Sequence, residues 1–130
     1  MQIQGDIIMS AHNDLGHWGE NVAADYLVRL GYVIIERNWK IHHKEIDIIA
    51  SNGTLFLFVE VKTRSNENFM PAYEAVDTKK RHNLMVAMHV YLRWHPVEIP
   101  CRFDIITVVG NRTSYEVFHY ENAVSNFIGV

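Results

Sequence analysis

Residues 44–62, with the sequence KEIDIIASNGTLFLFVEVK, decide the fold of this chain. Two apolar runs flank Asn52-Gly53, and Asn-Gly between strand-like runs is the strongest short signal for a hairpin with a two-residue turn. Side chains alternate between the two faces of a strand, so any even-length loop places Asp47, Glu60 and Lys62 on the same face. With the two-residue turn, Asp47 and Glu60 are diagonal neighbours. The stretch therefore predicts a hairpin that brings two carboxylates within reach of one metal ion.

The second strand of this hairpin ends in charged residues. Residues 55–59 are apolar on both faces, as expected for a central strand that is covered on both sides. Glu60 and Lys62 follow at once, and burying either charge is costly unless the group is paired or binds a ligand. Two interpretations stay open: an ion pair between Glu60 and Lys62 at the rim of the sheet, or a binding site that Asp47 completes.

The composition is that of a globular protein. The chain has 130 residues, of which 48% are hydrophobic and 21% are charged, and this suits a single domain. Cys101 is the one cysteine, which excludes an internal disulfide and suits a reducing compartment. The sequence shows neither a signal-peptide pattern nor an apolar run long enough to cross a membrane, so we expect a cytoplasmic protein with no membrane partner. Because the formal charge is -3, DNA binding would need a local basic patch or a metal ion that neutralises an acidic site.

Cap and turn signals divide the rest of the chain into helices and strands. Predicted helices run from a cap at Asn13 or Asp14 to a stop at Gly31, and from a cap at Asp77 or Thr78 to just before Pro96. Further expected elements are strands at 32–39, 101–109 and 115–120, a closing helix at 121–128, and an N-terminal arm at 1–13 that shows no clear period. This order predicts an α/β fold with a mixed sheet of about five strands flanked by helices, in a single domain at residues 14–130.

Each predicted helix carries a charged residue that calls for an explanation. Glu20 lines up with a row of small and apolar residues on the first helix, so we expect it to face a packed surface; an ordinary solvated glutamate near a helix N-terminus is the alternative. Lys80 lies at the start of the second helix, where the macrodipole disfavours a cation, so a nearby anion would explain it. Lys79 and Lys80 belong to the densest basic cluster of the chain, for which an ordinary solvated face is the alternative.

The pattern formed by Asp47 and Glu60-Val61-Lys62 resembles the PD-(D/E)xK motif of restriction-endonuclease-like nucleases. The wider chain resembles, over roughly residues 14–110, the YraN-like family. The blocks that carry this resemblance are, in order, GENVAADYL, GYVIIERNW, EIDIIA, FVEVKTR, AVDTKK and CRFDIITV. That family is classed as nuclease-like and is similar in its core to archaeal Holliday junction resolvases.

The resemblance implies a restriction-endonuclease-like, three-layer fold and a set of site residues. The implied catalytic positions are Glu20, Asp47, Glu60 and Lys62, with Lys80 as a further basic candidate. Two features depart from the family. Lys44 stands where the family usually has a glycine, and it adds positive charge beside the carboxylates; residues 1–13 have no clear counterpart.

The chemistry implied is metal-assisted hydrolysis of DNA phosphodiester bonds. Carboxylate oxygens suit Mg²⁺ or Mn²⁺, so Asp47 and Glu60 are the expected ligands, with the Val61 carbonyl as a third and Glu20 acting through water or at a second metal ion. Lys62 would position or deprotonate the attacking water, or stabilise the transition state. The expected phosphate-binding residues are Arg64, Lys80, Lys79 and Lys44.

Two other interpretations stay open. The chain could be a noncatalytic module that keeps the nuclease fold and binds nucleic acid or protein, or a structural α/β protein whose charges form a buried ion-pair network. For an enzyme acting on branched DNA, two active sites in a two-fold homodimer would be expected. Phe69, Tyr73 and the N-terminal arm are the candidates for such an interface.

Overall fold

The computed structural model describes residues 3–65 and 78–123, with side chains described from Asp14 onward in the first range and from Lys79 onward in the second. The elements are α1 (Ile3–Arg29), β1 (Val33–Ile41), β2 (Lys44–Ser51), β3 (Phe56–Arg64), α2 (Thr78–Trp94), β4 (Cys101–Gly110) and β5 (Tyr115–Tyr120). The five strands form one sheet in the order β1-β2-β3-β4-β5. Strands β3 and β4 are parallel and the other neighbouring pairs are antiparallel, so the expected mixed sheet is confirmed.

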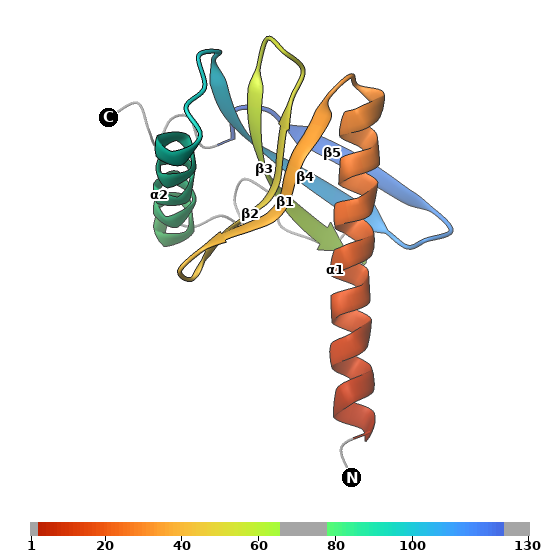
Figure 1. The fold of residues 1–130 in the computed structure, drawn as a ribbon. Coiled ribbons are helices and arrows are strands. Elements are labelled where there is room, and N and C mark those ends of the chain that lie inside the picture. The colour runs from red at the N-terminus through yellow and green to blue at the C-terminus, as the bar shows by residue number, and fades with distance from the viewer. Residues whose placement is uncertain (1–2, 66–77, 124–130) are drawn as a thin grey trace.

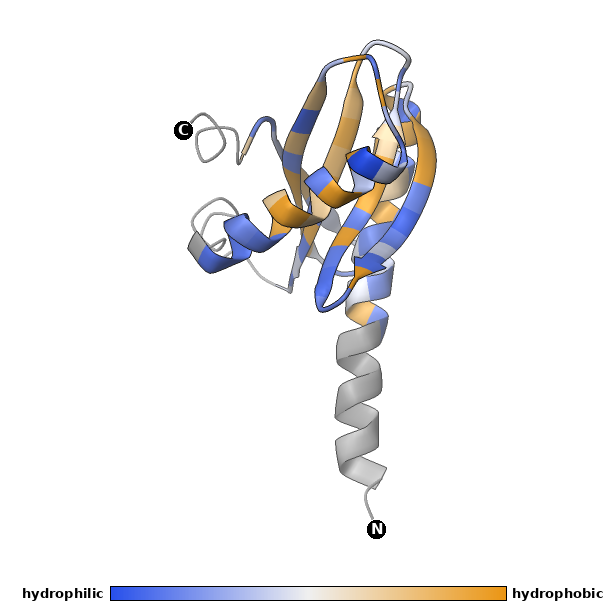
Figure 2. Cartoon of the chain, turned by 60° about the vertical axis from the view of Figure 1, so that its left-hand side comes forward, coloured by the Kyte–Doolittle hydropathy of each residue, from blue (hydrophilic) through white to orange (hydrophobic). Residues whose placement is uncertain are grey.

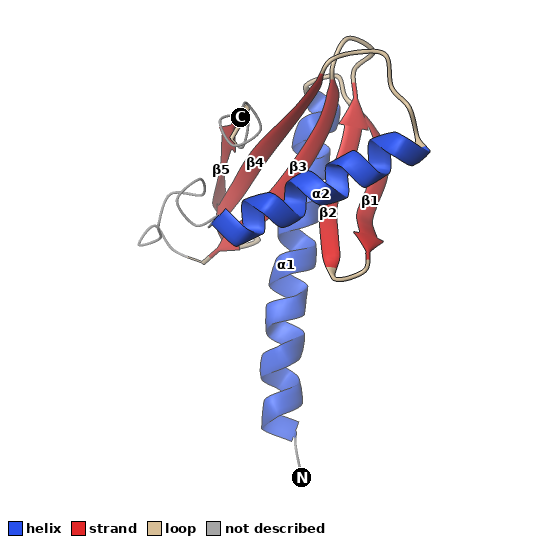
Figure 3. Cartoon of the chain, turned by 90° about the vertical axis from the view of Figure 1, so that its left-hand side faces the viewer, coloured by secondary structure: helices blue, strands red, loops and turns tan. Residues whose placement is uncertain are grey.

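The sheet is the middle layer of three. Figure 1 shows α1 on one face and α2 on the other, and Figure 3 shows α2 crossing in front of the strands. The half of the core that faces α1 consists of Val22, Ala23, Ala24, Leu27, Ile48, Ala50, Leu57, Val59, Ile106 and Val108. The half that faces α2 consists of Ile46, Ile49, Phe56, Phe58, Leu84, Met85, Ala87, Met88, Tyr91, Phe103 and Ile105. The three-layer α/β fold expected from the restriction-endonuclease-like resemblance is therefore confirmed.

Helix α1 is longer than the sequence signals indicated. It begins at Ile3, so the cap expected at Asn13 or Asp14 is wrong. No proline interrupts the preceding residues, and a side chain that can cap a helix does not end one when the residues before it also favour helix. This part of α1 extends beyond the sheet (Figure 1). The stop at Gly31 is confirmed: its φ is 100°, and the N–H of Tyr32 reaches back to a carbonyl of the last turn at 3.0 Å.

The other boundaries lie close to those expected. β1 runs to Ile41 rather than to residue 39, and β4 and β5 agree with expectation within one residue. Residues 121–123 form a turn, and the remainder of the closing helix expected at 121–128 lies outside the described residues, as do Phe69 and Tyr73. Over residues 3–65 and 78–123, neither helix combines the length and the hydropathy that a membrane crossing requires.

The hairpin of β2 and β3 has a wider turn than predicted. Ser51 pairs with Phe56, so four residues form the loop and the two-residue Asn-Gly turn is wrong. The Asn52 side chain explains the difference, because its Oδ1 accepts the N–H groups of Thr54 and Leu55 at 3.0 and 2.9 Å. Such side-chain hydrogen bonds give the backbone an alternative to the tight turn. Because four is also an even number, the predicted alternation of faces is retained through this part of the hairpin.

Candidate active site

Strand β1 changes the face to which its side chains point. Arg37 lies 3.7 Å from a carboxylate oxygen of Glu20, so it is on the side of α1. Trp39, two residues later, should share that face, but its ring packs edge-on against Tyr91 of α2 with the ring centres 5.2 Å apart. The residue between them, Asn38, has a φ of 52°, in the left-handed region that asparagine adopts more readily than most residues. The backbone at Asn38 therefore reverses the alternation of β1.

Strand β2 makes the same change opposite Asn38. Ile48 packs in the half of the core that faces α1, whereas Ile46 packs in the half that faces α2. Asp47 lies between them. The ladder between β1 and β2 continues on both sides of this position, so Asp47 lies opposite Asn38. The two irregular positions thus coincide in the sheet.

The carboxyl group of Asp47 connects β2 to β3 where the main-chain ladder no longer does. The β2–β3 ladder stops one residue short of Asp47, and Asp47 Oδ2 accepts the N–H of Val61 at 2.8 Å. Burial, followed by repulsion from Glu60, Glu20 and Glu45, raises the pKa of Asp47 to about 8, against the lowering effect of the Val61 hydrogen bond. Three neighbouring carboxylates therefore act on Asp47 at this end of the sheet.

Glu60 is the most buried of these carboxylates. It is 5% exposed, and its Oε1 lies 3.3 Å from Nζ of Lys62 and 3.1 Å from Nζ of Lys80. Burial by itself would lower the pKa of Lys80, but attraction to Glu60, Asp47 and Glu45 raises it above its ordinary value. The anion expected near the start of α2 is therefore Glu60, and the pairing of Glu60 with Lys62 is present as well.

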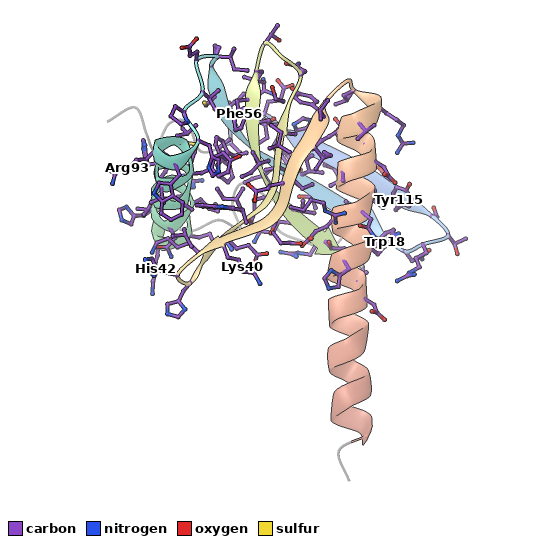
Figure 4. All side chains as sticks on the ribbon, viewed as in Figure 1. Trp18, Lys40, His42, Phe56, Arg93 and Tyr115 are labelled. Carbon is purple, nitrogen blue, oxygen red and sulfur yellow. The ribbon has the colours of Figure 1, made fainter. Side chains whose placement is uncertain are left out.

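Asp47, Glu60 and Lys80 border a cavity of about 220 Å³ between the β1–β2 hairpin, β3 and the start of α2, whereas Lys62 does not line it. We call this space the acidic cavity, and it is lined by His43, Lys44, Glu45, Asp47, Glu60, Lys80, Asn83 and Leu84. The carboxylates are buried or half-buried, whereas His43 and Lys80 are exposed, so the interior is acidic and the edge is basic. Figure 2 shows the mostly hydrophilic end of the hairpin, where Figure 4 places Lys40 and His42.

Glu20 reaches this site from the far side of the sheet. Its Oε1 accepts a hydrogen bond from Nδ2 of Asn38 at 2.9 Å, and the same Nδ2 donates to Oε1 of Glu45 at 2.9 Å. Glu45 lines the acidic cavity and Glu20 does not. Gly19 allows this approach, because a Cβ at that position would overlap the Thr63 side chain on β3. Glu20 is thus held beside the cavity rather than within it.

The predicted basic residues are distributed unequally. Lys44 and Lys80 line the acidic cavity, and Lys79 is exposed beside Lys80 in the first turns of α2. Arg64 does not line the cavity, and its Nη1 donates to the main-chain carbonyl of Thr63 at 2.9 Å. The structure therefore brings Lys44 and Lys80 to the carboxylates and leaves Arg64 bound to the backbone of its own strand.

Sequence reasoning missed four polar residues of the site. Asn38 bridges two carboxylates, and Glu45, His43 and Asn83 line the cavity. The signal for Asn38 is weak but physical, because an asparagine inside an otherwise strand-like run is a candidate for positive φ. Asn83 lies one turn after Lys80, so the helical period could have placed it at the same site.

Three carboxylates, those of Glu45, Asp47 and Glu60, line the acidic cavity, but they do not form a closed cage for a cation. Within the described residues, no group of three or more histidine, cysteine, aspartate or glutamate side chains is arranged to hold a metal ion. Asp47 and Glu60 share the cavity, and Val61 contributes its N–H to Asp47. Metal binding by these residues, by the Val61 carbonyl or by Glu20 stays a prediction.

The fold and the site define a small α/β protein with carboxylates and lysines gathered at one end of a mixed sheet. The chain belongs to the family described as Uncharacterised protein family UPF0102, whose model matches residues 19–108. This confirms the YraN-like family predicted from the sequence.

Relatives of similar length occur in several bacteria. UPF0102 proteins of Bacteroides thetaiotaomicron and Parabacteroides distasonis are 43% and 41% identical over 115 residues, which cover 88% of this chain and 95% of each relative. A UPF0102 protein of Flavobacterium psychrophilum is 38% identical over 119 residues, covering 92% of this chain and 100% of the relative. Among solved structures, Hjc, a Holliday junction resolvase of Archaeoglobus fulgidus, is similar at 16% identity with a TM-score of 0.45, covering 85% of this chain and 92% of that one.

Proposed function

We propose that this protein is a metal-dependent endonuclease that hydrolyses phosphodiester bonds of DNA, with branched or damaged DNA among its substrates. The observation that carries the proposal is the gathering of Asp47, Glu60 and Lys80 at one open cavity, with Lys62 ion-paired to Glu60 beside it. Buried charges that serve stability alone are satisfied by their partners, so such a network needs no open space beside it. Here the charges border about 220 Å³ of open space.

The donor set suits a hard divalent cation. Mg²⁺ and Mn²⁺ are usually held by one or two carboxylates together with water and substrate phosphate, and Asp47 and Glu60 offer two carboxylates from neighbouring strands. The Val61 carbonyl is a candidate third ligand, and Glu20 would act through water. When bound, the cation would supply a water of lowered pKa and offset the negative charge that develops on the phosphate.

The lysines of the site have separate tasks. Lys62, held 3.3 Å from Glu60, would orient the attacking water or accept its proton. Lys80 and Lys44 enter the cavity from α2 and β2 and would bind phosphate oxygens on either side of the scissile bond. Lys79 and Arg64 would extend the contact along the DNA backbone.

The charge distribution fits DNA as the partner. The chain has a formal charge of -3, so a phosphate backbone would be attracted to a local basic surface, such as the edge of the acidic cavity, rather than to the chain as a whole. Cutting two strands of a branched DNA requires two such sites, and a two-fold homodimer would provide them.

A cleavage assay with matched variants tests the proposal. The panel holds single-stranded, duplex, flap and four-way-junction DNA, each with Mg²⁺, with Mn²⁺ and with chelator. Glu60→Gln, Asp47→Asn and Lys62→Met are compared with Glu116→Gln, which changes an exposed carboxylate on β5. We expect metal-dependent cleavage that the three site variants lose and the control keeps, and sedimentation of the purified protein reports whether it is a dimer.

Two results would contradict the proposal. Cleavage that survives in all three site variants would come from a contaminant. A folded parent protein that binds these DNAs and cuts none of them would support the noncatalytic binding module in place of the enzyme.

A further inference from the structure

We infer that Asn38 is a positioning residue of this site, which holds the carboxylates of Glu20 and Glu45 beside Asp47 and Glu60. The inference rests on the proposed function and adds to it the residue through which α1 is joined to the acidic cavity. Asn38 has no place in the motif that suggested a nuclease, and it does not line the cavity.

The geometry of the Asn38 amide supports this role. Its Nδ2 donates to Oε1 of Glu20 and to Oε1 of Glu45, both at 2.9 Å. An amide nitrogen carries two N–H donors, so these contacts use its full donor capacity. Two carboxylates on one neutral group repel each other, and without the shared donor each would turn toward water. The Asn38 amide therefore holds the carboxylates of Glu20 and Glu45 close together, although their repulsion would otherwise separate them.

The backbone at Asn38 explains why this position needs asparagine. Its φ of 52° disfavours most side chains, because glycine adopts such a value readily and asparagine, aspartate and histidine adopt it more often than other residues do. Glycine has no donor there, and aspartate would add another carboxylate. Positive φ within a strand costs free energy that the surroundings must offset, and here it turns the side chain toward both α1 and β2.

The contacts also distinguish positioning from ordinary structural support. Asparagine that only supports a fold usually binds main-chain groups, whereas Asn38 binds two charged side chains, one of which lines the acidic cavity. Nη2 of Arg37 lies 3.7 Å from the same Oε1 of Glu20. Side chains that orient ligating carboxylates tune metal affinity in this way without touching the metal.

Asn38→Gly tests the inference, because glycine accepts the same backbone conformation and removes only the amide. The matched control is His42→Gly, which alters an exposed residue of the same hairpin that also has positive φ, 55°. Mn²⁺ binding is measured by calorimetry without DNA, and unfolding by urea titration. We expect Asn38→Gly to weaken Mn²⁺ binding by about tenfold with an unfolding midpoint no lower than that of the parent, and His42→Gly to bind as the parent does. In DNA cleavage, the kcat of Asn38→Gly should be lower than that of the parent, and its KM should be unchanged.

A double-mutant cycle separates action through Glu20 from an independent effect. If Asn38 acts by holding Glu20, then Asn38→Gly combined with Glu20→Gln loses less Mn²⁺ affinity than the two single losses together. Additive losses, or an Asn38→Gly protein that binds Mn²⁺ like the parent, overturn the inference and leave the proposed function intact. A parent that binds no Mn²⁺ and cleaves no DNA overturns the proposed function, and the role of Asn38 falls with it.

Discussion

The pH dependence of metal binding gives a quantitative test of the site at Asp47. Burial first, and then repulsion by neighbouring carboxylates, raises the pKa of Asp47 to about 8. A ligating carboxylate must be ionised, so each bound cation displaces the proton. With this pKa, about 1% of the Asp47 side chains are ionised at pH 6 and about half at pH 8. The apparent affinity for Mn²⁺ should therefore rise about 50-fold over that range.

Calorimetry can measure both the affinity and the proton. Titrations with Mn²⁺ at pH 6, 7 and 8, each in two buffers that differ in ionisation enthalpy, should show about 0.9 proton released per cation at pH 7. Asp47→Asn should bind weakly at all three values and release almost no proton. His43→Ala controls for the histidine that lines the same cavity. A parent whose affinity changes less than about threefold, with under about 0.2 proton released, would show that Asp47 is already ionised and would refute the reasoning.

The same pKa predicts the direction in which stability changes. The folded carboxyl group binds its proton more tightly than the unfolded one, whose pKa is near 3.8, so the metal-free protein should lose stability as the pH rises from about 4 to about 8. The difference sets an upper limit of about 6 kcal/mol on this loss. Asp47→Asn keeps an acceptor for the Val61 N–H and cannot ionise, so the urea concentration at which it unfolds should exceed that of the parent most at pH 8, less at pH 5, and not at all near pH 3.

Three other perturbations test the fold and the interface. Asp104 is fully buried and paired with Arg102 and His119, so Asp104→Ala should lower the free energy of unfolding by about 3–5 kcal/mol in urea titrations, and a loss under about 1 kcal/mol would contradict this role. Burial would raise the pKa of Asp104, but its hydrogen bonds lower it overall, so this stability should be lost only as the pH falls through the folded pKa. In Gly19→Ala the new Cβ would overlap the Thr63 side chain; we expect a loss of about 1–3 kcal/mol, reduced when Thr63→Ala is added. Lys80→Gln should weaken DNA binding and lower the slope of log affinity against log salt by about one, and an unchanged slope would remove Lys80 from the interface.

Much of the sheet could be predicted because the hydrophobic period and the turn residues agree. β4 and β5 follow from apolar runs separated by Gly110 and polar residues, and the end of α1 follows from Gly31. The start of α1 could not be predicted from Asn13 or Asp14, because a capping residue is a signal only when the helix has not already begun. The turn at Asn52 could not be predicted for a similar reason. Asparagine favours a tight two-residue turn, but its side chain can also accept hydrogen bonds from the backbone of a wider turn, as it does here.

The carboxylates of the site were predictable in part, and the reason lies in the register. A loop of two or four residues places the same side chains on the same face, so the shared face predicted for Asp47 and Glu60 did not depend on the exact turn. Their predicted diagonal relation did depend on it and is wrong, because the observed register continues to Asp47 directly opposite Glu60. Glu20 could be assigned to the site only through the family resemblance. The sequence period of a single helix or strand cannot predict a contact between α1 and β1. Its link to the site passes through Asn38, whose positive φ depends on the tertiary structure.

The coincidence of Asn38 and Asp47 in the sheet has a single physical consequence. A regular ladder at this position would pair the main chain of β2 with that of β3 and leave the Asp47 carboxyl group without the Val61 N–H. Because both strands reverse their alternation here, Asp47 instead accepts the Val61 N–H and borders open space. At this position the sheet therefore lacks main-chain hydrogen bonds between β2 and β3, and in their place it has a carboxylate that is both fixed and accessible. A cation site requires such a carboxylate, whereas a structural ion pair does not.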